Sequence, residues 1–215
     1  MKLRDQAYQR FTRGLLKREI RSGQFLSQRE LTRLTGMSLG AIRELIPRLE
    51  ADGLIRTVPQ RGMQVAQVDV SLIRNAFQLR EILERASAAA FSVQAPAAEF
   101  DRLQQTHEAI VAAAQEGVTP ALIEKAQTVD DAMHADIVDF LHNEIISNAY
   151  RVNSIKIRLI RQEQTRIDAR LVVPVMEEHL KIIAALRTRD PDRAAAAIGE
   201  HIASARNRAL GLPSP

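Results

Sequence analysis

The segment from Gln28 to Gly62 constrains the fold more than any other part of this chain. Apolar residues recur there at every third or fourth position in two short runs, which predicts two amphipathic helices. The runs comprise Leu31, Leu34 and Met37, then Ile42, Leu45, Ile46 and Leu49. Gly36 supplies a turn between the runs, and Ser38 can cap the second helix through its hydroxyl group. A strand at Leu54-Ile55 and a glycine-containing hairpin follow, so the segment predicts a winged helix-turn-helix.

The second predicted helix and the hairpin tip both present polar or cationic residues. The outward face of the helix carries Ser38, Leu39 and Arg43, and the tip reads Pro59-Gln60-Arg61-Gly62. In a winged helix-turn-helix the second helix enters the major groove of DNA, and cations at its edges contact phosphate. We therefore predict that the first part of the chain binds double-stranded DNA.

The positive charge of the chain is concentrated in the same part. Residues 1–67 contain 13 Lys and Arg against 6 Asp and Glu, whereas residues 68–215 contain 17 against 20. A DNA-binding domain needs such an excess because its cations replace the counterions of the phosphates. Solvated helix surfaces are the alternative explanation, but the coincidence with the helix-turn-helix pattern favours DNA binding.

The hairpin pattern ends near residues 65–69, which predicts one domain at residues 1–67 and another at residues 68–215. Beyond the boundary, helical periodicity continues to Gly211 without a strand pattern. Prolines, glycines and capping residues divide this stretch into about six helices, at about 70–93, 97–115, 120–142, 144–169, 173–188 and 191–210. The fold class is therefore mainly α, with an N-terminal winged helix-turn-helix and a C-terminal all-helical bundle.

Composition limits where the protein acts. Cysteine is absent, so disulfides and thiolate metal ligands are excluded. The N-terminal residues MKLRDQAYQR lack the apolar core of a signal peptide, and no apolar run reaches membrane-spanning length. We therefore expect a cytoplasmic protein without membrane segments.

Acidic and imidazole side chains in the second part have spacings that suit a metal site. Asp130 and His134 are four residues apart on one expected helix, so their side chains lie on the same face. His179 and His201 come from two later helices, and a bundle can bring such residues together in its interior. This set suits a divalent ion, with zinc preferred and nickel, manganese or iron as alternatives. Asp131, three residues from His134, is the alternative carboxylate ligand.

Other interpretations of the same residues stay open. The remaining histidines, His107 and His142, are expected on the surface. The set also fits a metalloenzyme in which Glu178, beside His179, acts as general base. The lack of a His-Glu-x-x-His motif and the basic first domain disfavour an enzyme. A metal sensor, in which the ion itself is the signal, is a further possibility.

Taken together, the two parts resemble the GntR family of bacterial transcription regulators, in its FadR-type (FCD) subfamily, over nearly the whole chain. The family's DNA-binding pattern appears here as Arg29-Glu30-Leu31, Gly36-Met37-Ser38, Arg43-Glu44, Leu49, Gly53-Leu54-Ile55 and Arg61-Gly62. The family's metal ligands, an Asp-x3-His pair and two later histidines, match Asp130, His134, His179 and His201. The two patterns in the correct order are far more specific than either pattern alone.

The resemblance implies a homodimer that binds a pseudo-palindromic double-stranded operator through paired winged domains. It also implies that DNA is contacted from the helices and the wing, by Arg29, Ser38, Arg43, Gln60, Arg61 and Gly62. Two departures concern this region: Leu39 replaces a frequent Arg, and Gln24-Phe25 replaces the usual Pro-Gly ahead of the helix pair. Both leave the fold intact but alter the expected operator, since Leu39 cannot make a bidentate contact with guanine.

The predicted effector is a small organic acid. A bound divalent ion leaves positions that a carboxylate can occupy, and a buried arginine would hold the other end of the molecule. We predict Arg80 for this role, because it stands in mid-helix beside Leu79 and Ile82. A surface ion pair between Arg80 and Glu84 is an almost equally weighted alternative. Asn143, which matches a frequent Asn after the first ligand helix of the family, is the second candidate.

Overall fold

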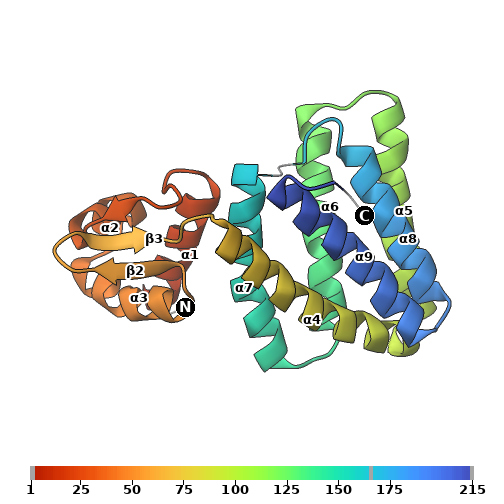
Figure 1. Cartoon of the computed structure of the whole chain (residues 1–215), viewed down its shortest axis with the longest axis horizontal. Helices are drawn as coiled ribbons and strands as arrows, with labels where there is room; N and C mark the ends of the chain where they lie inside the picture. The colour runs from red at the N-terminus through yellow and green to blue at the C-terminus, as the bar shows by residue number, and fades with distance from the viewer. Residues whose placement is uncertain (1–2, 165–166, 214–215) are drawn as a thin grey trace. The chain divides into compact units, whose positions relative to one another are not determined.

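The computed structural model describes residues 3–164 and 167–213, which are mostly helical (Figure 1). The residues group into two compact units. The first combines Met1–Ile73 with Ile155–Glu163, and the second combines Arg74–Ser154 with Gln164–Pro215. The predicted fold class is confirmed, because a small sheet accompanies the helices of the first unit and the second unit is a helical bundle.

The first unit has a winged helix-turn-helix arrangement. Its elements in chain order are α1 (Leu3–Leu16), β1 (Phe25–Leu26), α2 (Gln28–Thr35), α3 (Leu39–Ala51), β2 (Ile55–Val58) and β3 (Gly62–Val65). The strands form an antiparallel sheet in the order β1-β3-β2. Helix α1 packs on α2 and α3 and buries Ala7, Phe11 and Leu15 completely. This helix was not among the predicted elements, although these three residues recur at helical spacing.

The turn between α2 and α3 forms as predicted, with one correction. Gly36 ends α2 in the left-handed region at φ 63°, and the Ser38 hydroxyl accepts a hydrogen bond from the Ala41 amide at 3.3 Å. Met37 was expected on the first helix, but α2 ends at Thr35. Since the left-handed glycine stops the helix early, Met37 packs into the core from the turn instead.

The hairpin between β2 and β3 depends on the backbone of Gly62. Val58 pairs with Gly62, and Gln60 at the tip adopts a positive φ of 61°. Gly62 itself has φ 87°, and a Cβ atom there would lie 2.8 Å from the carbonyl oxygen of Leu26 in β1. A side chain is therefore excluded by the conformation and by the neighbouring strand. Gly62 has a structural role that is independent of any contact with DNA.

Six further helices follow among the described residues. They are α4 (Val70–Gln94), α5 (Ala97–Gln115), α6 (Pro120–Asp139), α7 (Glu144–Gln164), α8 (Val172–Arg187) and α9 (Pro191–Leu210). Within the described ranges, no helix combines the length and the apolar composition that a bilayer crossing needs.

Two of these helices are shorter than predicted. Helix α6 ends at Asp139 instead of near residue 142, and His142 adopts a left-handed φ of 48° that interrupts the helical path. Helix α7 spans Glu144–Gln164 and was predicted to reach about residue 169. Residues 165–166 of that extension lie outside the described residues, and residues 167–169 are not helical. The Asp168 carboxylate accepts hydrogen bonds from the amides of Arg170 and Leu171, which fixes a turn before α8.

Helix α8 is the centre of the second unit. It packs on α5, α6 and α9, and Figure 1 shows its long contact with α5. Side chains on the inner faces of α6, α8 and α9 therefore meet in the interior of this unit.

Candidate metal centre and nucleic-acid interface

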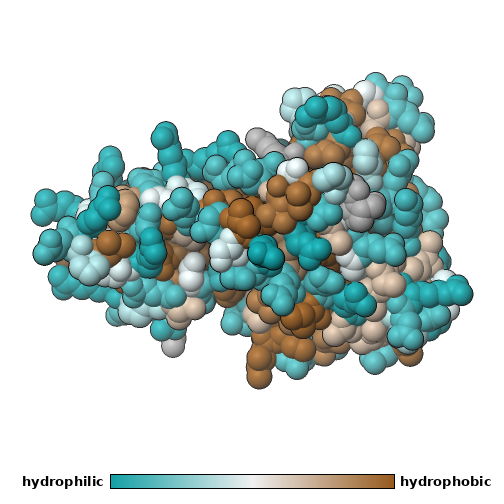
Figure 2. Space-filling model, in the orientation of Figure 1, coloured by the Kyte–Doolittle hydropathy of each residue, from teal (hydrophilic) through white to brown (hydrophobic). Residues whose placement is uncertain are grey.

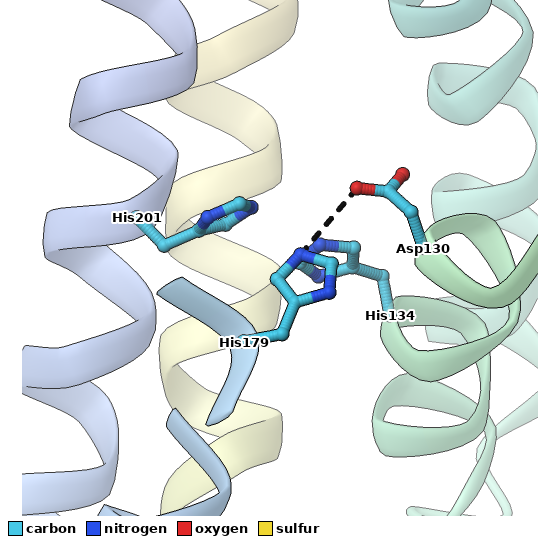
Figure 3. A group of neighbouring side chains, drawn as sticks. All are labelled: Asp130, His134, His179 and His201. Atoms are coloured by element: carbon cyan, nitrogen blue, oxygen red, sulfur yellow. Dashed lines mark ion pairs between the residues drawn. The ribbon is translucent and has the colours of Figure 1, made fainter. Parts of the chain in front are cut away.

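Four of the predicted residues converge in the second unit (Figure 3). Asp130 and His134 project from successive turns of α6, His179 comes from α8 and His201 comes from α9. All four are buried, with exposures between 0% and 4%. One possible ligand atom from each residue lies within 4.8 Å of those from the other three. Asp130, and not its neighbour Asp131, belongs to this convergent set.

The inner nitrogens of the three imidazoles face one another. The Nε2 atoms of His134, His179 and His201 are buried and have no hydrogen-bond partner among the described residues. The Nε2 of His179 lies 3.4 Å from the Oδ1 of Asp130. Buried polar atoms without partners are costly, and several acceptors facing one point require a proton or a cation.

The outer nitrogens of two imidazoles contact carboxylates. Nδ1 of His134 lies 2.6 Å from Oε2 of Glu84, and Nδ1 of His201 lies 2.7 Å from Oε2 of Glu178. Because an ionised carboxylate only accepts hydrogen bonds, each Nδ1 carries the proton and each Nε2 keeps its lone pair. Both histidines thus keep an inner lone pair on Nε2, the form of the ring that is able to coordinate a metal.

Arginines balance the charges of these carboxylates. Arg80 donates from Nε to Glu84 at 2.7 Å, and both side chains are almost wholly buried. Arg208 donates to both oxygens of Glu178 at 2.7 and 3.2 Å. Burial would raise the pKa of Glu84, but Arg80 and His134 outweigh it and lower the pKa to about 2. The pKa of Glu178 is likewise about 2, because His201 and Arg208 outweigh burial.

Burial also keeps the imidazoles neutral. Desolvation lowers the pKa of His134 to about 4, against the opposing influence of Glu84. It lowers the pKa of His179 and of His201 as well. Near neutral pH the inner nitrogens are therefore lone-pair donors that do not compete with protons.

His107 was predicted to lie on the surface, and this prediction is wrong. It is fully buried on α5, and its Nε2 lies 3.1 Å from Nδ1 of His179. The signal was present, because His107 shares helical spacing with the buried Phe100, Leu103 and Ile110. His142 is exposed, as expected.

The residues expected to hold an effector lie in different environments. Arg80 forms its pair with Glu84, but in the interior and not on the surface, and its Nη1 is buried without a hydrogen-bond partner among the described residues. Asn143 is exposed at the start of α7, where its side-chain oxygen accepts from the amides of Ile145 and Ile146 at 3.0 and 3.2 Å. This asparagine therefore caps the start of α7.

The residues expected to contact DNA are all exposed on the first unit. They are Arg29, Ser38, Arg43, Gln60, Arg61 and Gly62. Most of the face of this unit seen in Figure 2 is hydrophilic, as a phosphate-binding surface requires. Among the described residues, Arg43 on α3 is exposed and forms neither an ion pair nor a side-chain hydrogen bond.

The departure at Gln24-Phe25 acquires a physical role in the wing. The Arg61 guanidinium lies over the Phe25 ring, 4.1 Å from its centroid. Such a cation–π contact orders the long arginine side chain on the sheet. The other departure, Leu39, is 44% exposed at the first turn of α3.

Comparisons with known proteins agree with this arrangement. The model of the bacterial regulatory proteins of the gntR family matches residues 3–65, and that of the FCD domain matches residues 75–204. The HTH-type transcriptional repressor RspR of Escherichia coli K12 is 24% identical over 201 residues, which cover 92% of this chain and 84% of RspR. The structure of E. coli McbR/YncC is similar with a TM-score of 0.71, at 18% identity over 94% of each chain. The metal-free FCD domain of TM0439 is similar with a TM-score of 0.56, at 18% identity over 68% of this chain and 96% of that domain.

The buried Arg80–Glu84 pair gives a test of the charge balance around the centre. Glu84→Gln keeps the shape of the side chain but leaves the Arg80 charge without compensation. In metal-free protein the free energy of unfolding, measured by urea denaturation, should fall by about 3–5 kcal/mol. Glu81→Gln is the matched control, because Glu81 pairs with Arg85 and Arg206 at partly exposed positions. The free energy of unfolding of Glu81→Gln should fall by at most about 1 kcal/mol. Equal decreases in the two variants would contradict a special role of Glu84 in balancing the buried charge of Arg80.

Proposed function

This chain belongs to the gntR family of bacterial regulatory proteins and carries an FCD domain, and from that premise we propose that a small organic acid, bound at a divalent metal ion, controls its binding to operator DNA. The family consists of transcription regulators and not of enzymes, so the metalloenzyme alternative is set aside. The proposal has four components: the metal, the acid, the homodimer and the contacts with DNA.

The gathering of three buried Nε2 atoms, which have no hydrogen-bond partner among the described residues, beside the Asp130 carboxylate supports the metal component. His134, His179 and His201 would supply nitrogen ligands, and Asp130 would supply oxygen. Zinc fits this set best, because it accepts mixed nitrogen and oxygen ligands in a tetrahedral arrangement, and nickel, manganese or iron remain compatible. When bound, the ion would supply a Lewis-acidic centre for anionic oxygen ligands.

The buried guanidinium of Arg80 supports the effector component. Its Nε is engaged by Glu84, while Nη1 remains available as a donor in the interior. A carboxylate would give this nitrogen the charged partner that it lacks among the described side chains. We therefore keep Arg80 as the effector residue of the proposal and do not retain Asn143.

The DNA component assigns different tasks to different exposed residues. Arg43 on α3 would donate to a base edge in the major groove, and Ser38 would combine its capping role with a contact near the helix start. Arg29 on α2 would contact phosphate, and Gln60 and Arg61 would contact DNA from the wing. Leu39 offers only apolar contact, as with a thymine methyl group, so the operator should differ from that of relatives with Arg at this position.

A homodimer would place two such surfaces on the two halves of a pseudo-palindromic operator. On α4, Leu79, Ile82 and Val93 are 39%, 60% and 54% exposed at helical spacing. These apolar side chains give a second copy of the chain a surface to cover. Since the operator is chromosomal, the cytoplasm is the proposed place of action.

The metal and the acid can be separated by comparing three states of the protein. DNA selected in vitro by the protein serves as the operator. Fluorescence anisotropy then measures the affinity of the protein for this DNA in three states. The states are metal-free protein, protein with Zn²⁺, and protein with Zn²⁺ plus each member of a panel of small carboxylates. Zn²⁺ at about 100 times its Kd should stabilise the fold by about 2.7 kcal/mol, which a melting curve detects. An effective carboxylate should then change operator affinity by about 5–150-fold.

His179→Ala should abolish the zinc-dependent stabilisation, and His142→Ala, at an exposed histidine, should retain it. An operator affinity that responds to Zn²⁺ alone and ignores every carboxylate would favour the metal sensor. If neither Zn²⁺ nor any carboxylate changes melting or operator affinity, the proposed control mechanism is wrong.

Base reading by Arg43 predicts a local loss of specificity. Arg43→Ala should weaken binding to the selected operator by about 1–3 kcal/mol and relax the preference at one base position of each half-site. Arg170→Ala removes the same charge from an exposed position of the second unit and should leave the preference unchanged. Unaltered operator affinity in anisotropy titrations of Arg43→Ala would remove this residue from the interface.

The homodimer predicts a sedimentation mass of about twice the 24.0 kDa of the chain. Ile82→Glu should weaken self-association, because it places a charge within the apolar surface of α4. Ile145→Glu is the control, since Ile145 is 82% exposed on α7. A monomeric mass for the unmodified protein at micromolar concentration would count against the dimer.

A further inference from the structure

The metal-facing histidine on α8 has an unusual neighbour. The outer nitrogens of His134 and His201 face carboxylates, whereas that of His179 faces the imidazole of His107. Nothing in the proposed function so far uses His107. Its side chain is fully buried on α5, the helix with which α8 makes its longest contact.

The hydrogen bonds of His107 fix where its proton lies. Its Nδ1 is 2.7 Å from the carbonyl oxygen of Leu103, one turn earlier on α5. A carbonyl oxygen only accepts, so Nδ1 of the neutral ring carries the hydrogen and Nε2 keeps a lone pair. The Nε2 can therefore only accept, at 3.1 Å, from Nδ1 of His179.

The proton on Nδ1 of His179 leaves its Nε2 with a lone pair directed at the centre. In the other tautomer, Nε2 would carry the hydrogen and could donate to Oδ1 of Asp130, 3.4 Å away. That hydrogen bond would join two of the proposed metal ligands and close the centre to an ion. The choice between the tautomers thus decides whether His179 is ready to bind metal.

We propose that His107 is a positioning residue that holds His179 in the tautomer able to bind a divalent ion. The proposal rests on the metal site described under the proposed function. Outer hydrogen-bond partners of metal-bound histidines commonly fix the tautomer and the ring orientation in this way. His107 completes the set, so that each of the three imidazoles has an acceptor on its outer nitrogen.

A neutral acceptor suits this position on electrostatic grounds. Glu84 and Glu178 each bring a negative charge that an arginine, Arg80 or Arg208, neutralises. An imidazole accepts the same hydrogen bond without adding charge to the closely packed contact between α5 and α8. His107 therefore orients His179 without the desolvation cost of another buried ion pair.

A purely structural role for His107 makes a different prediction from a positioning role. The rings of His107 and His179 meet edge-on with centroids 5.1 Å apart, a contact that a phenylalanine at residue 107 would reproduce. His107→Phe thus preserves packing and removes both nitrogens. His107→Gln restores an acceptor oxygen near the position of Nε2.

The test uses the full chain labelled with 15N-histidine. In metal-free unmodified protein, NMR should find His179 protonated at Nδ1, and in His107→Phe the proton should move to Nε2. Zn²⁺ affinity, measured by competition with a chromophoric chelator, should fall about 10–100-fold in His107→Phe. His107→Gln should recover most of the affinity and the Nδ1 tautomer, and His142→Phe, at an exposed site, should match the unmodified protein in both measurements.

Each contrary result has a distinct meaning. If metal-free unmodified protein already carries the His179 proton on Nε2, the proposal is overturned without any variant. The proposal is also overturned if His107→Phe keeps the His179 tautomer and the Zn²⁺ affinity of the unmodified protein. It is overturned as well if His107→Phe and His107→Gln lose Zn²⁺ affinity equally while the His179 tautomer stays the same. Failure of the unmodified protein to bind Zn²⁺ would instead reject the proposed metal site, and the tautomer measurement would still test the role of His107.

Discussion

The burial of several hydrogen-bond acceptors around one point is the constraint on which the second unit depends. The inner nitrogens of His134, His179 and His201 and a carboxylate oxygen of Asp130 meet in the interior, away from water. Burial keeps the imidazoles neutral and so removes the protons that would otherwise satisfy them. Such an arrangement is unfavourable by itself, and a bound cation would make it favourable.

The charged groups outside this centre follow from the same requirement. Buried ion pairs such as Arg80 with Glu84 contribute little net stability, because desolvation offsets the attraction. The role of these ion pairs follows from the second contact that each carboxylate makes. Glu84 orients His134, and Glu178 orients His201, while an arginine cancels the charge that each carboxylate brings. The pairs are therefore explained better by the orientation of the histidines than by the stability of the bundle.

The sequence predicted those features that depend on local spacing. The four-residue interval of Asp130 and His134 placed them on one face of α6, and Gly36 and Ser38 marked the turn between α2 and α3. Features that depend on contacts between distant segments were missed. The burial of His107 requires knowledge that α5 lies against α8. The burial of Arg80 was predicted, but its pairing with Glu84 inside the bundle was expected only as a surface alternative.

Similar limits applied to the first unit. The periodicity of α1 was visible in its sequence, but a short amphipathic helix has little meaning until α2 and α3 provide a core for it. Gly62 was assigned to DNA from its place at the hairpin tip, whereas the carbonyl of Leu26 supplies a separate steric reason for glycine. Phe25, noted only as a departure from a family pattern, packs under the guanidinium of Arg61.

Charge balance links the proposed metal to the proposed effector. The pairs of Arg80 with Glu84 and of Arg208 with Glu178 are each neutral, and the three imidazoles carry no charge near neutral pH. A divalent ion would then face Asp130 as the single anionic ligand of the set, which leaves positive charge in excess. In a buried, weakly polar environment such an excess attracts an anion strongly. A carboxylate that binds the ion and reaches the buried Nη1 of Arg80 would satisfy both groups, whereas a neutral ligand would satisfy neither charge.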